Sequence, residues 1–237
     1  FEVAEAWQQF ASTSFRLQGH YQLIGLYPQA FELNQAVLEK NVEEKSISTA
    51  LFNMGAIHDL FGHYDQALSL YDRCLSIDKK IDDRQGEGAT LNNISQIYSA
   101  KGDYDTALRY LEQSLAITKQ IGDRKGEGAT LNNISQIHKV RGDYDTALRY
   151  LEQSLAIRQQ IGDRQGEGAT LNNLATTAHA KGDYDTALRY LEQSLAIRQQ
   201  IGDRKGEGAT LNNFATTALA KGDYDTALRY LEQSLAI

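Results

Sequence analysis

The string GDYDTALRYLEQSLAI at residues 102–117 returns without change at 142–157, 182–197 and 222–237. Successive copies start 40 residues apart, so the chain contains a tandem internal repeat. Looser copies begin at Gly62 (GHYDQALSLYDRCLSI) and at Gly25 (GLYPQAFELNQAVLEK). The residues that precede each copy also recur, with LNN starting at Leu91, Leu131, Leu171 and Leu211. These copies define about six units.

Each unit has the hydrophobic spacing of two α-helices. In the second helix of one unit, steps of three, four or seven residues join two apolar sets: Tyr104, Leu108, Leu111 and Leu115, then Ala107, Tyr110, Ile117 and Ile121. A helix with two apolar stripes must be buried on two sides, so each unit has to stack on its neighbours. The sequence therefore predicts an all-α solenoid of helix-turn-helix units.

The repeats divide the chain into an irregular N-terminal unit at residues 1–45 and five regular units at residues 46–237. The segment 20–24 is additional in the first unit and predicts an inserted loop or an extra helical turn. The last unit ends on an apolar helix without a capping helix. Because the sequence begins at Phe1 rather than at methionine, we expect a piece of a longer protein.

The turns carry helix-ending and helix-starting residues. Gly102 is predicted to take the left-handed conformation that ends one helix, and Asp103 and Asp123 to cap the helices that follow. Gly126 and Gly128 fall in the first turns of a helix, where glycine costs about 1 kcal/mol relative to alanine. Their recurrence predicts close helix contact at the seam between units, or else an irregular first turn.

The repeat resembles the tetratricopeptide signature, in which W-x2-L-G-x2-Y is followed by A-x3-F. The positions that carry the resemblance are Leu91, Ile94, Ser95, Tyr98, Gly102, Tyr104, Ala107 and Leu111, with Trp7, Phe10 and Ala11 at the corresponding N-terminal positions. The period of 40 rather than 34, and the missing closing proline, are departures. This variant is similar to the repeats of kinesin light chains and of bacterial signalling proteins of the STAND and CHAT types. The resemblance implies a right-handed superhelix whose first helices line a concave groove that receives partners.

By this resemblance, a set of side chains along the first helices, polar except for Phe52, faces the groove and forms the predicted partner-binding site. They are Phe52, Asp59, Asn92, Asn93, Gln96, Asn132, Asn133, Gln136, Lys139, Asn172, Asn173, Thr176, His179, Asn212, Asn213 and Thr216. Asparagine amides both donate and accept, which suits the backbone of a bound peptide. In the alternative interpretation, the Asn93 series links neighbouring units and the Asn92 series is only solvated.

The first helix varies between units while the second stays constant, from ISQIYSAK to ISQIHKVR, LATTAHAK and FATTALAK. A partner that contacts several units would produce this pattern, and so would duplication followed by drift. Lys139, His179 and Leu219 are the candidates for local selectivity.

The composition argues against several other functions. The net charge of −7 provides no basic surface for nucleic acid, and no apolar run is long enough to cross a membrane. With Cys74 as its one cysteine the chain forms no internal disulfide, which suits a cytoplasmic protein. The histidines lack metal-ligand spacing, the GEGATL segments lack the lysine of a phosphate loop, and no catalytic constellation or cofactor site is apparent.

The sequence therefore predicts a non-enzymatic module that binds a protein or peptide ligand in its groove. One alternative is a homo-oligomer formed through the open face of the last repeat. Another is a regulatory repeat protein that assists a partner enzyme. The near-identity of four units is also compatible with a consensus-designed array.

Overall fold

The computed structural model describes residues 8–9, 11–14, 25–40 and 42–236. The chain folds into two compact units, Phe1–Ile121 and Gly122–Ile237. The helices of unit 1 are α2 (Tyr27–Leu38), α3 (Glu44–Leu60), α4 (Tyr64–Lys80), α5 (Arg84–Ala100) and α6 (Tyr104–Gln120). Those of unit 2 are α7 (Arg124–Val140), α8 (Tyr144–Gln160), α9 (Arg164–Lys181), α10 (Tyr184–Ile201), α11 (Arg204–Lys221) and α12 (Tyr224–Leu235). The predicted insertion at residues 20–24, together with Trp7 and Phe10 of the N-terminal signature, lies outside the described residues.

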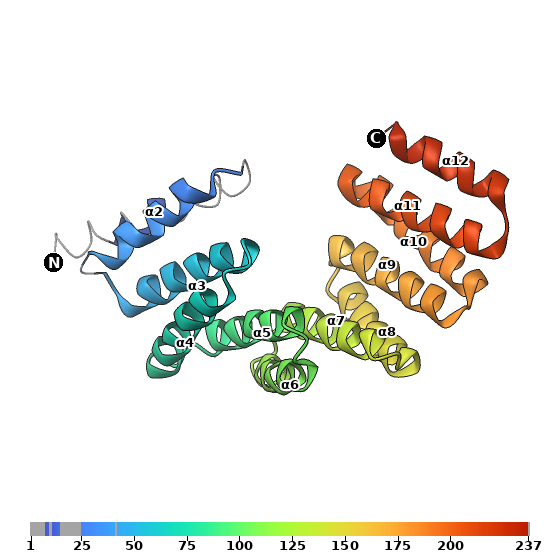
Figure 1. Cartoon of the computed structure of the whole chain (residues 1–237). Helices are drawn as coiled ribbons and strands as arrows, with labels where there is room; N and C mark the ends of the chain where they lie inside the picture. Colours follow the sequence, from blue (N-terminus) through green and yellow to red (C-terminus); the bar gives the residue numbers. More distant parts are fainter. Residues whose placement is uncertain (1–7, 10, 15–24, 41, 237) are drawn as a thin grey trace. The chain divides into compact units, whose positions relative to one another are not determined.

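The helices pack as consecutive hairpins within each unit (Figure 1). The first helix of each hairpin, here called the A helix, is α3, α5, α7, α9 or α11, and the B helix follows it. Each B helix also packs on the next A helix inside its unit, as α4 does on α5 and α8 on α9. These contacts confirm the predicted all-α solenoid of helix-turn-helix repeats.

The hydrophobic core is shared between neighbouring hairpins. One cluster in unit 2 joins Leu151 of α8, Leu171 and Leu174 of α9, and Ile197 of α10. Three of these four side chains are less than 2% exposed, so their burial depends on the adjacent repeat. Fully burying a leucine or isoleucine contributes about 1.5–3 kcal/mol. Stacking is therefore a condition of folding, as the two apolar stripes predicted.

The turns follow the predicted chemistry. Gly102 has φ +79°, and the Asp103 carboxylate accepts a hydrogen bond from the Thr106 amide at 3.1 Å. At the seam between repeats, Asp123 accepts from the amide of Gly126 at 2.9 Å. The caps at Asp103 and Asp123 are thus confirmed, and both helices are regular from their first turn.

Glycine at the third residue of an A helix allows a side chain of the preceding repeat to lie against the backbone. A Cβ atom on Gly166 would overlap the guanidinium of Arg158, which belongs to α8. The same holds for Gly206 and Arg198. The predicted close contact at the seam is present at these two positions, and the alternative of an irregular turn is wrong.

Ion pairs between repeats add to the shared core. An acid four residues ahead of an arginine, the pattern of Asp105 and Arg109, predicts a pair within one helix. The equivalent Asp145 and Asp185 instead contact Lys181 and Lys221 of the next repeat, at 2.5 and 2.6 Å. These acids therefore connect adjacent hairpins.

Candidate partner-binding surface

The A helices of unit 2 carry a row of polar side chains from the predicted groove set. We define the A-helix face as Asn132, Gln136 and Lys139 of α7, Asn172, Asn173, Thr176 and His179 of α9, and Asn213 and Thr216 of α11. All of them are half-buried except Thr216, which is exposed, as is Asn212 beside it. Steps of three or four residues place the members from each helix on one side of that helix.

A ladder of asparagine amides connects the A helices across this face. The side-chain amide of Asn173 donates to Asn132 Oδ1 at 2.8 Å, and that of Asn213 donates to Asn172 Oδ1 at 2.9 Å. Each contact joins the second asparagine of one repeat to the first asparagine of the repeat before it. Asn173 and Asn213 therefore link neighbouring repeats, the alternative role that the sequence left open for this series.

The ladder differs in unit 1 because Phe52 stands where later repeats have their first asparagine. Phe52 has no side-chain oxygen that could accept a hydrogen bond from Asn93. The side-chain amide of Asn93 instead lies 3.3 Å from the hydroxyl of Tyr71. Gln96 donates to Asn93 Oδ1 at 3.4 Å. One repeat earlier, Asn53 donates to Asn34 Oδ1 at 3.1 Å.

The variable side chains of the A-helix face also contact the next repeat. Lys139 Nζ donates to Thr176 Oγ1 at 2.9 Å, and burial lowers the pKa of Lys139. His179 Nδ1 lies 3.1 Å from Thr217 Oγ1, and its ring centroid is 5.3 Å from that of Tyr184. Positions 139 and 179 thus affect both the packing of the repeats and the surface shown to a ligand.

A small cavity of about 60 Å³ opens on this face between α9, α10 and α11. Its lining includes Thr176, His179, Asn213 and Thr216, all of which belong to the predicted set. Sites for small-molecule ligands usually measure about 300–1,000 Å³. The cavity is therefore suited to the tip of a side chain, or to ordered water, rather than to a metabolite.

Gln136 has a donor without an acceptor. Its Nε2 atom is buried and forms no hydrogen bond with any residue that the structure describes. A buried donor left without a partner costs about 1–3 kcal/mol. The Nε2 donor of Gln136 is therefore unused by the described part of the chain.

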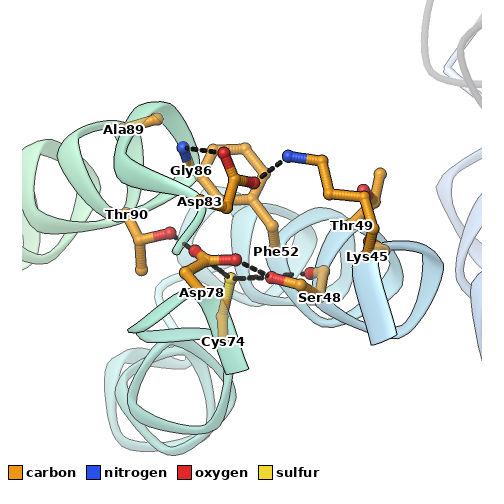
Figure 2. A pocket seen from close by; sticks show the side chains of 10 residues that line it. All are labelled: Lys45, Ser48, Thr49, Phe52, Cys74, Asp78, Asp83, Gly86, Ala89 and Thr90. Carbon is orange, nitrogen blue, oxygen red and sulfur yellow. Dashed lines mark hydrogen bonds and ion pairs between the residues drawn. The ribbon is translucent and has the colours of Figure 1, made fainter. Parts of the chain in front are cut away.

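The two predicted positions on α3 lie apart from the amide ladder. Burial raises the pKa of Asp59, which is half-buried near the end of the helix. Phe52 lines a cavity of about 150 Å³ between α3 and α5, with α4 beneath it (Figure 2). Three polar residues of this cavity, Lys45, Ser48 and Asp78, were missed by sequence reasoning. The available signal was Asp78 itself, because later repeats have Thr118, Arg158 and Arg198 at that position.

The described part of the chain contains no group of three histidine, cysteine, aspartate or glutamate side chains arranged to hold a metal ion. None of its helices combines the length and the apolar character needed to cross a membrane.

The helical hairpins, their shared cores and the polar A helices are those of a tetratricopeptide array. The sequence profile of the tetratricopeptide repeat matches residues 46–120, 86–160, 126–200 and 166–237. The chain belongs to the tetratricopeptide repeat family. No curated protein matches it in sequence.

Solved structures share the fold at low sequence identity. The STAND protein PH0952 from Pyrococcus horikoshii, which has a tetratricopeptide repeat sensor, is 17% identical with a TM-score of 0.79, over 94% of this chain and 35% of that one. The nearly identical repeats of a kinesin light chain from Podosopora anserina are 22% identical with a TM-score of 0.65, over 79% and 93%. NprR in complex with its cognate peptide NprX is 16% identical with a TM-score of 0.70, over 97% and 66%. The predicted resemblance to kinesin light chain and STAND repeats is confirmed.

Proposed function

We propose that the chain binds a protein or peptide segment along its A-helix face, as a scaffold or sensor module of a larger bacterial regulator. The tetratricopeptide fold is typical of protein-interaction scaffolds, and NprR, which shares the fold, has been solved with a peptide. The proposed role is binding and not catalysis. A cytoplasmic location belongs to the same proposal.

The unpartnered amide of Gln136 is the observation that carries this proposal. The neighbouring asparagines use amide groups to hold adjacent repeats together, whereas the Nε2 atom of Gln136 is buried without an acceptor. A backbone carbonyl of a bound segment would supply one. Because the ladder fixes the spacing of α7, α9 and α11, such a segment would meet polar groups at regular intervals.

The variable residues Lys139 and His179 would give the surface its selectivity. Both are half-buried and hydrogen-bonded to the next A helix, so they contribute polar atoms without moving freely. A pre-organised surface loses less entropy on binding than a mobile one. The B helices, whose sequence is nearly constant, instead form the packing contacts between neighbouring repeats.

Gln136→Ala separates binding from folding because the Nε2 donor that it removes has no partner among the residues that the structure describes. Peptides would be selected from a random library on the immobilised chain, and their affinities measured by fluorescence anisotropy. We expect the substitution to weaken binding about 2- to 10-fold, the value of one hydrogen bond. The matched control is Gln153→Ala, which changes the same residue type on the exposed side of α8.

Circular dichroism should show both variants folded like the parent. Equal affinities for the parent, Gln136→Ala and Gln153→Ala would place the bound segment elsewhere and overturn the A-helix face as the site. Substituting Asn132 or Asn172 is a poorer test, because each of these side chains accepts a hydrogen bond that joins two repeats.

The exposed face of α12 favours a second candidate, self-association. Tyr224, Leu228 and Leu235 are 71, 59 and 88% exposed, while the equivalent Tyr184, Leu188 and Leu195 of α10 are half-buried. A second copy of the chain, or a further helix, would cover this apolar side. The third alternative, a regulator that assists an enzyme, stays a prediction.

A further inference from the structure

The cavity between α3 and α5 has a buried carboxylate at its floor. Asp78 of α4 is 1% exposed and accepts a hydrogen bond from the hydroxyl of Ser48. The thiol of Cys74 lies 3.5 Å from its other oxygen. Among the residues that the structure describes, none forms an ion pair with Asp78. A buried charge of this kind is normally compensated by an opposite charge.

Later repeats show which group fits this part of the fold. Asp78 occupies the position of Arg158 and Arg198 in α8 and α10. The guanidinium of Arg158 lies 2.6 Å from the cap Asp163 and directly against Gly166. Arg198 repeats this arrangement with Asp203 and Gly206. The space between a B helix and the first turn of the next A helix therefore accommodates a guanidinium twice in unit 2.

Unit 1 keeps the surroundings of that guanidinium but lacks the arginine. Asp83 caps α5 through the amide of Gly86 at 3.1 Å, as Asp163 caps α9. The carboxylate of Asp78 lies against Gly86, where later repeats have the guanidinium, and a cavity of about 150 Å³ opens beside it. An engineered cavity of roughly this volume takes up a benzene molecule, so a planar guanidinium head fits.

The charges of the cavity favour a cation. Asp78 and Asp83 supply two negative charges, and Lys45, which pairs with Asp83 at the mouth, supplies one positive charge (Figure 2). Burial raises the pKa of the Cys74 thiol to about 11, so this side chain stays neutral at physiological pH. One negative charge is left, and it belongs to the buried Asp78.

Phe52 makes arginine a better occupant than lysine. Its half-buried ring lines the cavity, and its centroid lies 5.8 Å from that of Tyr71. A guanidinium stacks on an aromatic ring while its fork of donors binds a carboxylate, whereas an ammonium group provides only a point charge. Phe52, which stands where later repeats have their first asparagine, would therefore stack on the guanidinium.

We propose that this cavity receives an arginine side chain of the bound protein or peptide, with its guanidinium on Asp78 and against Phe52. The proposal rests on the proposed function, because it identifies one side chain of the partner. It places the arginine of the ligand at the same seam between a B helix and the next A helix where two later repeats have their own.

The test is an NMR titration of the 237-residue chain with N-acetyl-arginine methylamide as the probe. We expect saturable shifts at Phe52 and Ala89, and no comparable binding of the citrulline analogue, which is planar but uncharged. Asp78→Asn should weaken binding roughly 10- to 100-fold, as expected for hydrogen bonds to a charged group. Asp72→Asn, an exposed acid of the same helix, should leave it unchanged.

Asp78→Arg is the second variant, because it restores the residue of the later repeats and fills the cavity from within. It should stay folded and abolish probe binding. Absence of saturable shifts in the parent, equal binding of citrulline, or binding that survives Asp78→Arg would each overturn the proposal. Phe52→Leu preserves burial and should weaken arginine binding even if Asp78→Asn were to unfold.

The outcome is independent of the test of the A-helix face. Gln136→Ala should not change binding of the arginine probe, and Asp78→Asn should affect library peptides only when they contain arginine. If the arginine probe does not bind but Gln136→Ala still weakens the binding of library peptides, the cavity proposal alone is rejected. If the probe binds but Gln136→Ala leaves peptide binding unchanged, the A-helix face alone is rejected.

Discussion

At the scale of single residues, Gly55 and Tyr71 form a matched pair in the first regular repeat. Tyr71 is fully buried where the later repeats have a leucine such as Leu111, and burial raises its pKa. A Cβ atom on Gly55 would lie 2.7 Å from the Tyr71 ring. Ser95 and Ala175, at the same position in other repeats, face a smaller leucine and have room for their side chains.

We expect Gly55→Ala to destabilise the chain by about 1–2 kcal/mol. Glycine to alanine inside a helix normally stabilises by up to ~1 kcal/mol, but overpacking a core costs about 1–3 kcal/mol, and the buried ring has little space into which it can move. Urea unfolding followed by circular dichroism measures the difference. Adding Tyr71→Leu should recover the loss, and a Gly55→Ala variant as stable as the parent would contradict the steric argument.

At the scale of helices, the cap residues of the B helices connect stability to pH. In unit 2, Asp143, Asp183 and Asp223 each accept hydrogen bonds from the hydroxyl and the amide of the threonine three residues later, and these bonds lower the pKa of each carboxyl from 3.8. A carboxyl whose pKa is lower in the folded state stabilises the fold above the unfolded value. That contribution disappears as the pH falls through the folded value.

The parent chain should therefore lose stability as the pH falls below about 4. Replacing the three caps by asparagine keeps a side chain that caps helices almost as well as aspartate but removes the titration. The triple variant should match the parent in stability at pH 7 and lose less stability by pH 3. Urea midpoints at the two pH values provide the comparison, and identical acid losses would show that other carboxylates dominate.

Much of this architecture was predictable because it depends on local sequence. Asp103, Gly102 and the two apolar stripes of the B helix act within one turn or one helix, so their roles follow from spacing alone. The partner of Asn173 could not be predicted in this way, because its contact with Asn132 depends on how two A helices are aligned. The cavity at Asp78 was missed for a related reason, since it lies where one repeat has an aspartate in place of the arginine of two later repeats.

At the scale of the whole molecule, the described hairpins of each unit pack on their neighbours, and seams of the same sequence recur. The helix segments 144–160 and 184–200 are identical, and each is followed by IGDR. Arg158 therefore contacts Asp163 and Gly166 as Arg198 contacts Asp203 and Gly206. A seam of this kind should form wherever its two sides are brought together.

Deleting residues 164–203 tests this directly, because it removes α9 and α10 and joins Asp163 to Arg204. Arg158 would then lie against Gly206, and Asn213 would meet Asn132 in place of Asn172. We expect helicity per residue to be unchanged and unfolding to stay cooperative, with a denaturant m-value lower by about a sixth, in proportion to the surface lost.

Deleting only residues 164–183 is the matched control, since it keeps the Asp163 cap but places one B helix after another. That variant should expose apolar surface and bind a hydrophobic dye, because no A helix remains between α8 and α10 to complete their shared core. If both deletions behaved alike, stability would not depend on the order of A and B helices, and the stacking of hairpins could not be what holds this unit together.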